Sequence, residues 1–281
     1  MIAPTRTRFA PSPTGYLHLG HAFAALTAAA AAHRLGGVML LRIEDIDPSR
    51  CRPEFETAIV EDLRWLGLHW PEPVRRQSDH IDDYAAALAA LDAGGLIYPC
   101  FCTRADIRRE IAASPAAPHG PDGPVYPGTC RGLDPNTAAA RRAAGAPFAL
   151  RLDVAKARAT ASPNLWFEDD SRGRITAHPE KFGDVVVARK DAPTSYHLAV
   201  TVDDHLQGIT LVTRGEDLLE ATHIHRLLQD LLGYAPPRYA HHRLLTDDSG
   251  ARYAKRDGAV TLRALRAAGE TPEAIRARLQ R

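Results

Sequence analysis

The fold is determined by a stretch near the N-terminus, which reads Arg8-Phe9-Ala10-Pro11-Ser12-Pro13-Thr14-Gly15-Tyr16-Leu17-His18-Leu19-Gly20-His21. Residues 6–10 are expected to form a short strand, and the Pro- and Gly-containing residues 11–15 are typical of a turn. The Ala-rich segment 21–35 predicts a helix that ends at Gly36-Gly37, and the apolar run 38–43 predicts a buried parallel strand. Strand, helix and strand in this order form a βαβ unit, which favours a Rossmann-like α/β sheet that binds a nucleotide.

Within this stretch, the segment His18-Leu19-Gly20-His21 lies where the strand and turn lead into the helix. A helix N-terminus attracts phosphate through its unpaired backbone N–H groups and its dipole. Two imidazoles there could donate hydrogen bonds to negative charge that develops on a phosphoryl group, and Gly20 would let a base or ribose approach the backbone. Two surface histidines beside a helix start are the structural alternative for this motif taken alone.

The rest of the chain continues the α/β pattern. Helical periodicity predicts helices at 54–66, 81–93 and 218–232, and one or two short helices after Thr261. Apolar runs predict strands at 147–153, 184–188, 196–202 and 209–213, whereas Pro and Gly make 114–136 irregular. We expect two halves of a catalytic domain, 1–97 and 182–240, a small insertion subdomain at 98–181, and a helical tail at 241–281.

The composition is typical of a globular protein, with 45% hydrophobic and 25% charged residues among 281. The longest apolar stretch, residues 22–32, is shorter than the ~20 residues of a membrane span, and the N-terminus lacks the apolar core of a secretion signal. We therefore expect a cytoplasmic protein with no membrane partner. The net charge of +1 does not decide on a nucleic-acid partner, and the basic tail at 252–281 fits a solvated helix face and a phosphate-contacting surface equally well.

Several ordered segments together resemble the class I glutamyl-tRNA synthetases. They are the opening stretch 8–21, Arg42-Ile43-Glu44-Asp45-Ile46-Asp47, residues 65–70, Gln77-Ser78, residues 196–205, and Arg214-Gly215-Glu216-Asp217. The resemblance covers about Arg6 to Ala259 and implies an enzyme that activates L-glutamate with ATP. It also implies a glutamate site formed by Arg8, Phe9, Ala10, Pro11, Ser12, Glu44, Tyr196 and Arg214.

In this implied site, Glu44 would pair with the α-ammonium of glutamate and Tyr196 would donate its hydroxyl. Arg8 and Arg214 would supply the cations for the two carboxylates, and their apportionment stays open. An ion pair of Glu44 with Arg42 or Arg50 is the structural alternative. The substrate carboxylate itself would attack the α-phosphate, so that catalysis needs positioning and charge stabilisation rather than a protein nucleophile.

The second nucleotide motif of the family is a mobile loop that reads Lys-x-Ser-Lys-Arg. Here it reads Arg252-Tyr253-Ala254-Lys255-Arg256, so that the first Lys is Arg and the Ser is Ala. Only four of the 35 basic residues are lysines, which suggests that Lys255 is a chemical requirement, because a compact ammonium can follow a triphosphate into its transition state. We expect His18, His21 and Lys255 to be catalytic, and His18, Gly20, His21 and Lys255 to bind ATP together with Mg²⁺.

Three of the four cysteines, Cys100, Cys102 and Cys130, could supply thiolates to one Zn²⁺ per chain, whereas Cys51 is expected to be a free thiol. Zinc prefers four tetrahedral ligands, and chemistry alone favours His119 as the fourth. The resemblance points instead to Tyr126, in the spacing Tyr-x₃-Cys. Three unliganded thiols are the alternative.

Only 26 residues follow Lys255, which leaves no room for the anticodon-binding domain of the family. The shortened form resembles paralogues that esterify glutamate onto the queuosine base in the anticodon loop of tRNA(Asp). Val200 agrees, because the tRNA-charging members have Asn at this position. We therefore expect a monomer whose partners are ATP, L-glutamate and queuosine-containing tRNA(Asp). The alternatives are a minimal synthetase that charges a tRNA 3′ end, a ligase that acts on a small molecule, and a non-catalytic paralogue.

Overall fold

The computed structural model describes residues 4–113, 119–121, 123–245 and 260–279. Its centre is a parallel sheet in which β1 (Arg6–Phe9), β2 (Val38–Ile43) and β3 (Arg75–Arg76) are neighbours, with Arg8 opposite Leu40. Beside β1, the backbone N–H of Thr210 donates to the carbonyl of Arg6 at 3.0 Å, which places β11 (Leu211–Gly215) along the free edge of β1. The expected strands 6–10 and 38–43 and the Rossmann-like parallel sheet are confirmed.

β11 confirms the strand predicted at 209–213, and beyond it the sheet continues through strands that the sequence did not predict. β11 pairs in parallel with β12 (Arg238–His242), and β12 pairs with β8 (Trp166–Asp169) through Tyr239 and Asp169. β9 (Gly173–Thr176) closes the sheet as an antiparallel hairpin partner of β8. The division into domains stays a prediction, and residues 166–176, which fall inside the expected insertion, belong to this sheet.

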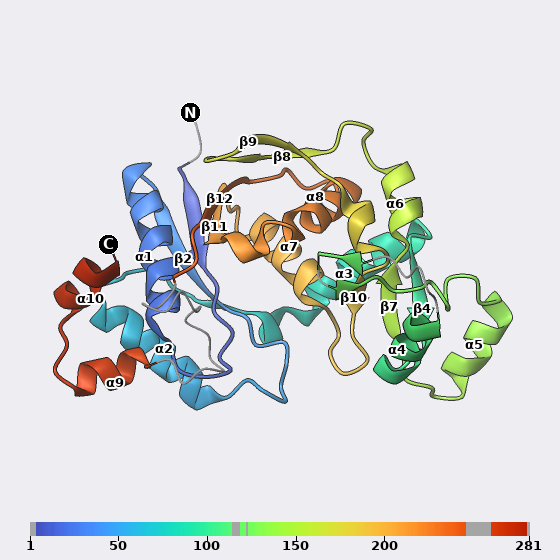
Figure 1. Ribbon diagram of the computed structural model, residues 1–281, viewed down its shortest axis with the longest axis horizontal. Coiled ribbons are helices and arrows are strands. Elements are labelled where there is room, and N and C mark those ends of the chain that lie inside the picture. The colour runs from blue at the N-terminus through green and yellow to red at the C-terminus, as the bar shows by residue number, and fades with distance from the viewer. Residues whose placement is uncertain (1–3, 114–118, 122, 246–259, 280–281) are drawn as a thin grey trace.

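Two helical layers cover the sheet, one on each face (Figure 1). The first contains α1 (Leu19–Arg34), α2 (Pro53–Trp65), α9 (Leu262–Ala267) and α10 (Pro272–Leu279), and its core includes Leu41 of β2. The second contains α3 (Ile81–Ala93), α6 (Val154–Thr160), α7 (Tyr196–Leu206) and α8 (Ala221–Leu231), and Leu40 packs against it. Neighbouring side chains of β2 therefore enter opposite cores, as expected for a parallel sheet buried on both faces.

The helix boundaries follow from local chemistry. α1 begins after His18, whose Nδ1 accepts the backbone N–H of Gly20 at 3.1 Å. After α1, a Cβ at Gly37 would lie 1.9 Å from the carbonyl oxygen of Thr5, so that a larger residue would push the chain away from β1. The expected helices 21–35, 54–66, 81–93 and 218–232 are present with ends within three residues of the predicted ones, and two short helices follow Thr261 as expected.

The strand expected at 196–202 is wrong, because these residues form α7. Ser195 caps this helix by accepting the backbone N–H of Leu198, and residues 198–204 are all buried. Because residues 198–204 are buried on every side of the helix, its polar and apolar residues do not separate onto two faces, and the 3.6-residue period is absent from the sequence. The β-branched and aromatic residues of the segment then suggest a strand.

The insertion forms a separate lobe at the right of Figure 1. Its antiparallel sheet has the order β10 (Val186–Ala188), β7 (Ala149–Leu152) and β4 (Ile97–Cys100). Around it lie α4 (Arg104–Ala113) and α5 (Pro135–Ala143). Two strands of two residues each, β5 (His119–Gly120) and β6 (Gly123–Pro124), pair antiparallel beside them. The strands predicted at 147–153 and 184–188 are present, and little regular structure lies between α4 and α5 where the chain is described.

Candidate active site

A cavity of about 530 Å³ lies at the carboxyl ends of β1 and β11, beside the start of α1. All eight residues expected to bind glutamate line it: Arg8, Phe9, Ala10, Pro11, Ser12, Glu44, Tyr196 and Arg214. His21 also lines it, and Thr213 and Gly215 complete the β11 side. The structure thus brings the eight expected residues, of which Arg8 and Arg214 are 206 positions apart in the chain, around one space, although what the cavity binds stays a prediction.

The two histidines of the motif pack together at the start of α1, with ring centroids 3.8 Å apart. His18 Nδ1 accepts the backbone N–H of Gly20, and His21 Nδ1 accepts the backbone N–H of His18 at 3.2 Å. Because both Nδ1 atoms act as acceptors, each neutral ring carries its proton on Nε2. Nε2–H is the group that could donate to a phosphoryl oxygen.

Glu44 follows β2 and lines the cavity. Its carboxylate lies 3.4 Å from a guanidinium nitrogen of Arg42, so the ion pair with Arg42 that the sequence left open is present. Arg50, the other suggested partner, pairs with Asp47 at 2.8 Å. Burial raises the pKa of the Glu44 carboxyl to about 7, although Arg42 and Arg8 oppose the shift. A substrate ammonium beside Glu44 would restore its charged form.

Arg42 is fully buried beneath the cavity and connects β2 to α7. It donates to Asp204 and Gln207, each at 2.9 Å, and its Nε lies 3.6 Å from Asp203. Burial opposes the charge of Arg42, but Asp204, Glu44 and Asp203 outweigh this effect and raise its pKa above the usual range. Apart from the pair with Glu44, these contacts of Arg42 were not predicted, because no local pattern in the sequence indicates a partner 162 positions away.

The two arginines expected to bind the carboxylates of glutamate, Arg8 and Arg214, have different partners in the structure. Arg8 donates to the Asp204 carboxylate at 3.0 Å and to the carbonyl of Thr213 at 3.1 Å. Arg214 instead donates to neutral groups, the imidazoles of His241 and His225 and the hydroxyl of Thr222. None of these three partners was predicted, because each lies among other polar residues, Thr222 and His225 beside His223 and Arg226 and His241 beside His242, so that no local pattern distinguishes them.

Tyr196 begins α7 and forms the wall of the cavity between Glu44 and Arg214. Burial raises the pKa of its hydroxyl, although Arg214 opposes the shift. The phenol is therefore neutral and able to donate a hydrogen bond, as the sequence predicts.

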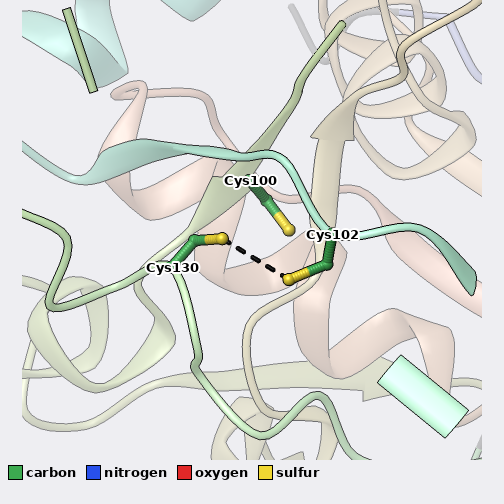
Figure 2. Close-up of side chains that lie close together, drawn as sticks. All are labelled: Cys100, Cys102 and Cys130. Atoms are coloured by element: carbon green, nitrogen blue, oxygen red, sulfur yellow. Dashed lines mark hydrogen bonds between the residues drawn. The ribbon is translucent and has the colours of Figure 1, made fainter. Parts of the chain in front are cut away.

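The expected metal ligands Cys100, Cys102 and Cys130 meet in the insertion, with their sulfur atoms all within 4.8 Å of one another (Figure 2). The Sγ atoms of Cys102 and Cys130 are 3.5 Å apart. Zn–S bonds of about 2.3 Å in a tetrahedron separate the sulfurs by about 3.8 Å, so this donor set fits a zinc ion. Cys51 lies outside this cluster.

The Tyr126 oxygen lies among the same three residues. It is 3.4 Å from Cys100 Sγ and 3.6 Å from Cys102 Sγ, and it accepts the backbone N–H of Cys130 at 3.0 Å. The guanidinium of Arg151 lies 3.8 Å from the centre of its ring. The side chain of His119, the alternative ligand, is outside the described part of the structure.

The second nucleotide motif, with Lys255, lies outside the described residues. The segments on either side of it both approach α1. His242, at the end of β12, packs edge-on against Phe23 with ring centroids 5.0 Å apart, and Thr261 forms a β-bridge with His18. In the part of the chain that is described, no helix is long and apolar enough to cross a membrane.

Comparison with known proteins agrees with this geometry. The family model of the class I (E and Q) tRNA synthetase catalytic domain matches residues 4–281. The chain therefore belongs to this family, and it is a ligase of the aminoacyl-tRNA synthetase class.

The names of individual relatives are more specific about activity than the family description. The chain is 50% identical to the Glutamyl-Q tRNA(Asp) synthetase of Rhodobacter capsulatus, over 96% of this chain and 98% of the relative. It is 40% identical to the Glutamate–tRNA ligase of Aquifex aeolicus, over 98% of this chain and 56% of that protein. The chain also matches the crystal structure of a glutamate tRNA ligase from Elizabethkingia meningosepticum in complex with its amino acid, with a TM-score of 0.75 at 30% identity. This match covers 91% of this chain and 52% of the ligase chain.

Proposed function

We propose that the protein activates L-glutamate with ATP to glutamyl-adenylate without requiring tRNA, and transfers the glutamate to the queuosine base in the anticodon loop of tRNA(Asp). The observation that carries the first step is the single cavity lined by all eight expected glutamate residues, with His21 of the phosphate motif in its wall. The names of the relatives with the higher identity carry the second step.

In the first step, Glu44 binds the α-ammonium of glutamate, while Arg8, Arg214 and Tyr196 bind its carboxylates. An oxygen of the α-carboxylate attacks the α-phosphorus of ATP, a new O–P bond forms, and the bond to pyrophosphate breaks. Mg²⁺ bound to ATP stabilises the leaving pyrophosphate. The Nε2–H groups of His18 and His21 donate to the phosphoryl oxygens as their charge increases.

Lys255 is the proposed third contributor to this step. The neighbouring segments of the chain support this role, because one contacts Phe23 of α1 and the other forms a bridge with His18. The described residues before and after Lys255 thus both contact α1, whose N-terminus is the expected phosphate site.

For the insertion, we propose a zinc ion held by Cys100, Cys102, Cys130 and Tyr126. Bonds to the metal would organise a segment with few apolar side chains. The proposal for Tyr126 is supported by the position of its oxygen, which lies among the three cysteines, 3.4 Å from Cys100 Sγ.

A second cavity, of about 400 Å³, suggests where the acceptor enters. It shares Tyr196 with the glutamate cavity and is otherwise lined by the insertion, which contributes Arg151, by residues 182–189, which contribute Arg189, and by the start of α7. An unstacked base in this space would lie beside the activated glutamate, and loop bases are the parts of RNA that proteins usually read.

The test is a transfer assay with labelled glutamate and tRNA(Asp), with and without queuosine. We expect labelling of the queuosine-containing tRNA alone, and glutamate-dependent ATP–pyrophosphate exchange in the absence of tRNA. Robust labelling of tRNA without queuosine would favour a minimal synthetase. Exchange with no labelled tRNA would favour a small-molecule ligase, and absence of exchange would contradict the whole proposal. The expected monomeric state and cytoplasmic location stay predictions. Light scattering, which measures the mass of the protein in solution, would test the monomeric state.

A further inference from the structure

Arg214, at the end of β11, lines the glutamate cavity but forms no ion pair with any residue that the structure describes. Its Nε donates to Nε2 of His241 at 3.2 Å, one Nη to Nδ1 of His225 at 3.1 Å, and the other Nη to the Thr222 hydroxyl at 2.6 Å. A guanidinium has five N–H donors, so two remain, which is enough for both oxygens of a carboxylate.

The hydrogen bonds determine which nitrogen of His241 carries the proton. Arg214 can only donate, so Nε2 of His241 must present its lone pair and the ring proton must lie on Nδ1. Nδ1 is 2.7 Å from the carboxylate of Asp169, whose Oδ1 also accepts the hydroxyl of Ser171 at 2.7 Å. Asp169, the last residue of β8, therefore fixes the tautomer and orientation of His241, and His241 in turn fixes Arg214.

The same reasoning applies to His225 on α8. Its Nδ1 accepts from Arg214, so its proton lies on Nε2, which is 3.2 Å from Nδ1 of His197 on α7. Arg214 is thus held from two sides by imidazoles that must both be neutral.

The electrostatic consequence becomes clear in comparison with Arg8. The charge of Arg8 is compensated directly, because the Asp204 carboxylate lies 3.0 Å from its Nε. The anion nearest to Arg214 along its hydrogen bonds, Asp169, is separated from it by the whole imidazole of His241. Since Coulomb attraction falls with distance, Arg214 keeps more of its attraction for an anion in the cavity.

We propose that Asp169, His241 and His225 are positioning residues that hold Arg214 and preserve its charge for a carboxylate of the amino-acid substrate. None of the three lines the cavity. The inference rests on the proposed function and deepens it, because it assigns the affinity for the substrate anion to residues outside the site.

The experiment measures KM values for glutamate and ATP in tRNA-independent ATP–pyrophosphate exchange. In Asp169→Asn the new amide can donate to Nδ1, which moves the ring proton to Nε2, where it opposes the N–H of Arg214. We expect the KM for glutamate to rise about 10- to 100-fold, the worth of one hydrogen bond to a charged group, and the KM for ATP to stay within about twofold. If Asp169 only stabilised the fold, Asp169→Asn would change the KM values for both glutamate and ATP or lower the amount of folded enzyme.

A second pair of variants keeps the test valid if Asp169→Asn folds poorly. His225→Leu removes the acceptor and should raise the KM for glutamate, whereas His225→Asn retains an acceptor near Nδ1 and should restore most of it. His223→Asn is the matched control, because His223 is a buried histidine of the same helix that accepts the backbone N–H of His178 instead.

The outcomes separate the two proposals. Wild-type exchange with an unchanged glutamate KM in Asp169→Asn and His225→Leu would overturn the positioning role alone. The same would follow if His223→Asn raised that KM as much as His225→Leu. Absence of glutamate-dependent exchange in the wild type would overturn the proposed function, and this inference with it.

Discussion

The raised pKa of Glu44 predicts that glutamate activation depends on pH near neutrality. The side chain is 10% exposed, and burial raises its pKa to about 7. Only the ionised carboxylate can pair with the substrate ammonium. About nine tenths of the free enzyme is ionised at pH 8 and about one tenth at pH 6, so kcat/KM for glutamate should fall roughly tenfold from pH 8 to pH 6.

Glu44→Gln isolates this effect, because the phosphates of ATP also change protonation in this range. The variant is nearly isosteric and has no titrating carboxyl. At pH 8 it should lose about 10- to 100-fold in kcat/KM for glutamate, since a hydrogen bond to a charged group is replaced by a neutral one. The ratio of wild type to variant, measured by pyrophosphate exchange at saturating ATP and Mg²⁺, should then be about tenfold smaller at pH 6.

Stability should change in the opposite direction. The pKa of Glu44 is raised from 4.5 to about 7 in the folded protein, so the fold binds the proton more tightly than the unfolded chain. Stability is therefore lost as pH rises from 4.5 to 7, and at pH 8 the loss is at most about 3 kcal/mol. Glu44→Gln avoids this loss and should unfold at higher urea than the wild type at pH 8, with little difference near pH 4. A wild-type to variant activity ratio that stays constant between pH 6 and pH 8 would refute the reasoning.

Three further predictions concern other parts of the molecule. Purified protein should contain about one zinc per chain by metal analysis. Cys130→Ser should lose the zinc and have a lower Tm, whereas Cys51→Ser should keep the zinc content and the Tm of the wild type. A folded, metal-free wild type would contradict the site. Arg42→Met should lower the free energy of unfolding by about 3–5 kcal/mol in urea titrations, because buried carboxylates lose their cation; a change below about 1 kcal/mol would show that they are compensated otherwise. Lys255→Ala should reduce exchange by about 10²–10³-fold with unchanged circular dichroism, and near-normal exchange would exclude its role at the phosphates.

The parts of the fold that the sequence predicted are those whose signal is local. All signals for the β1–α1–β2 unit lie within residues 6–43: the proline turn before the helix, the Ala-rich helix itself and the glycine pair that ends it. The strand β12 was missed because five residues with alternating burial, Arg238–His242, are stabilised by neighbours in β11 and β8 that lie elsewhere in the sequence. The helix α7 was misread because burial on all sides removes its amphipathic period.

The sequence by itself determined which residues could be expected around the cavity, because the motifs that resemble the family contain them in order. Arg8, Glu44, Tyr196 and Arg214 could therefore be named before their positions were known. Only the tertiary structure decided what lies behind them, the Arg42 cluster and the chain from Asp169 through His241 to Arg214. Such contacts join residues far apart in the chain, and a buried hydrogen bond depends on distances that folding alone sets.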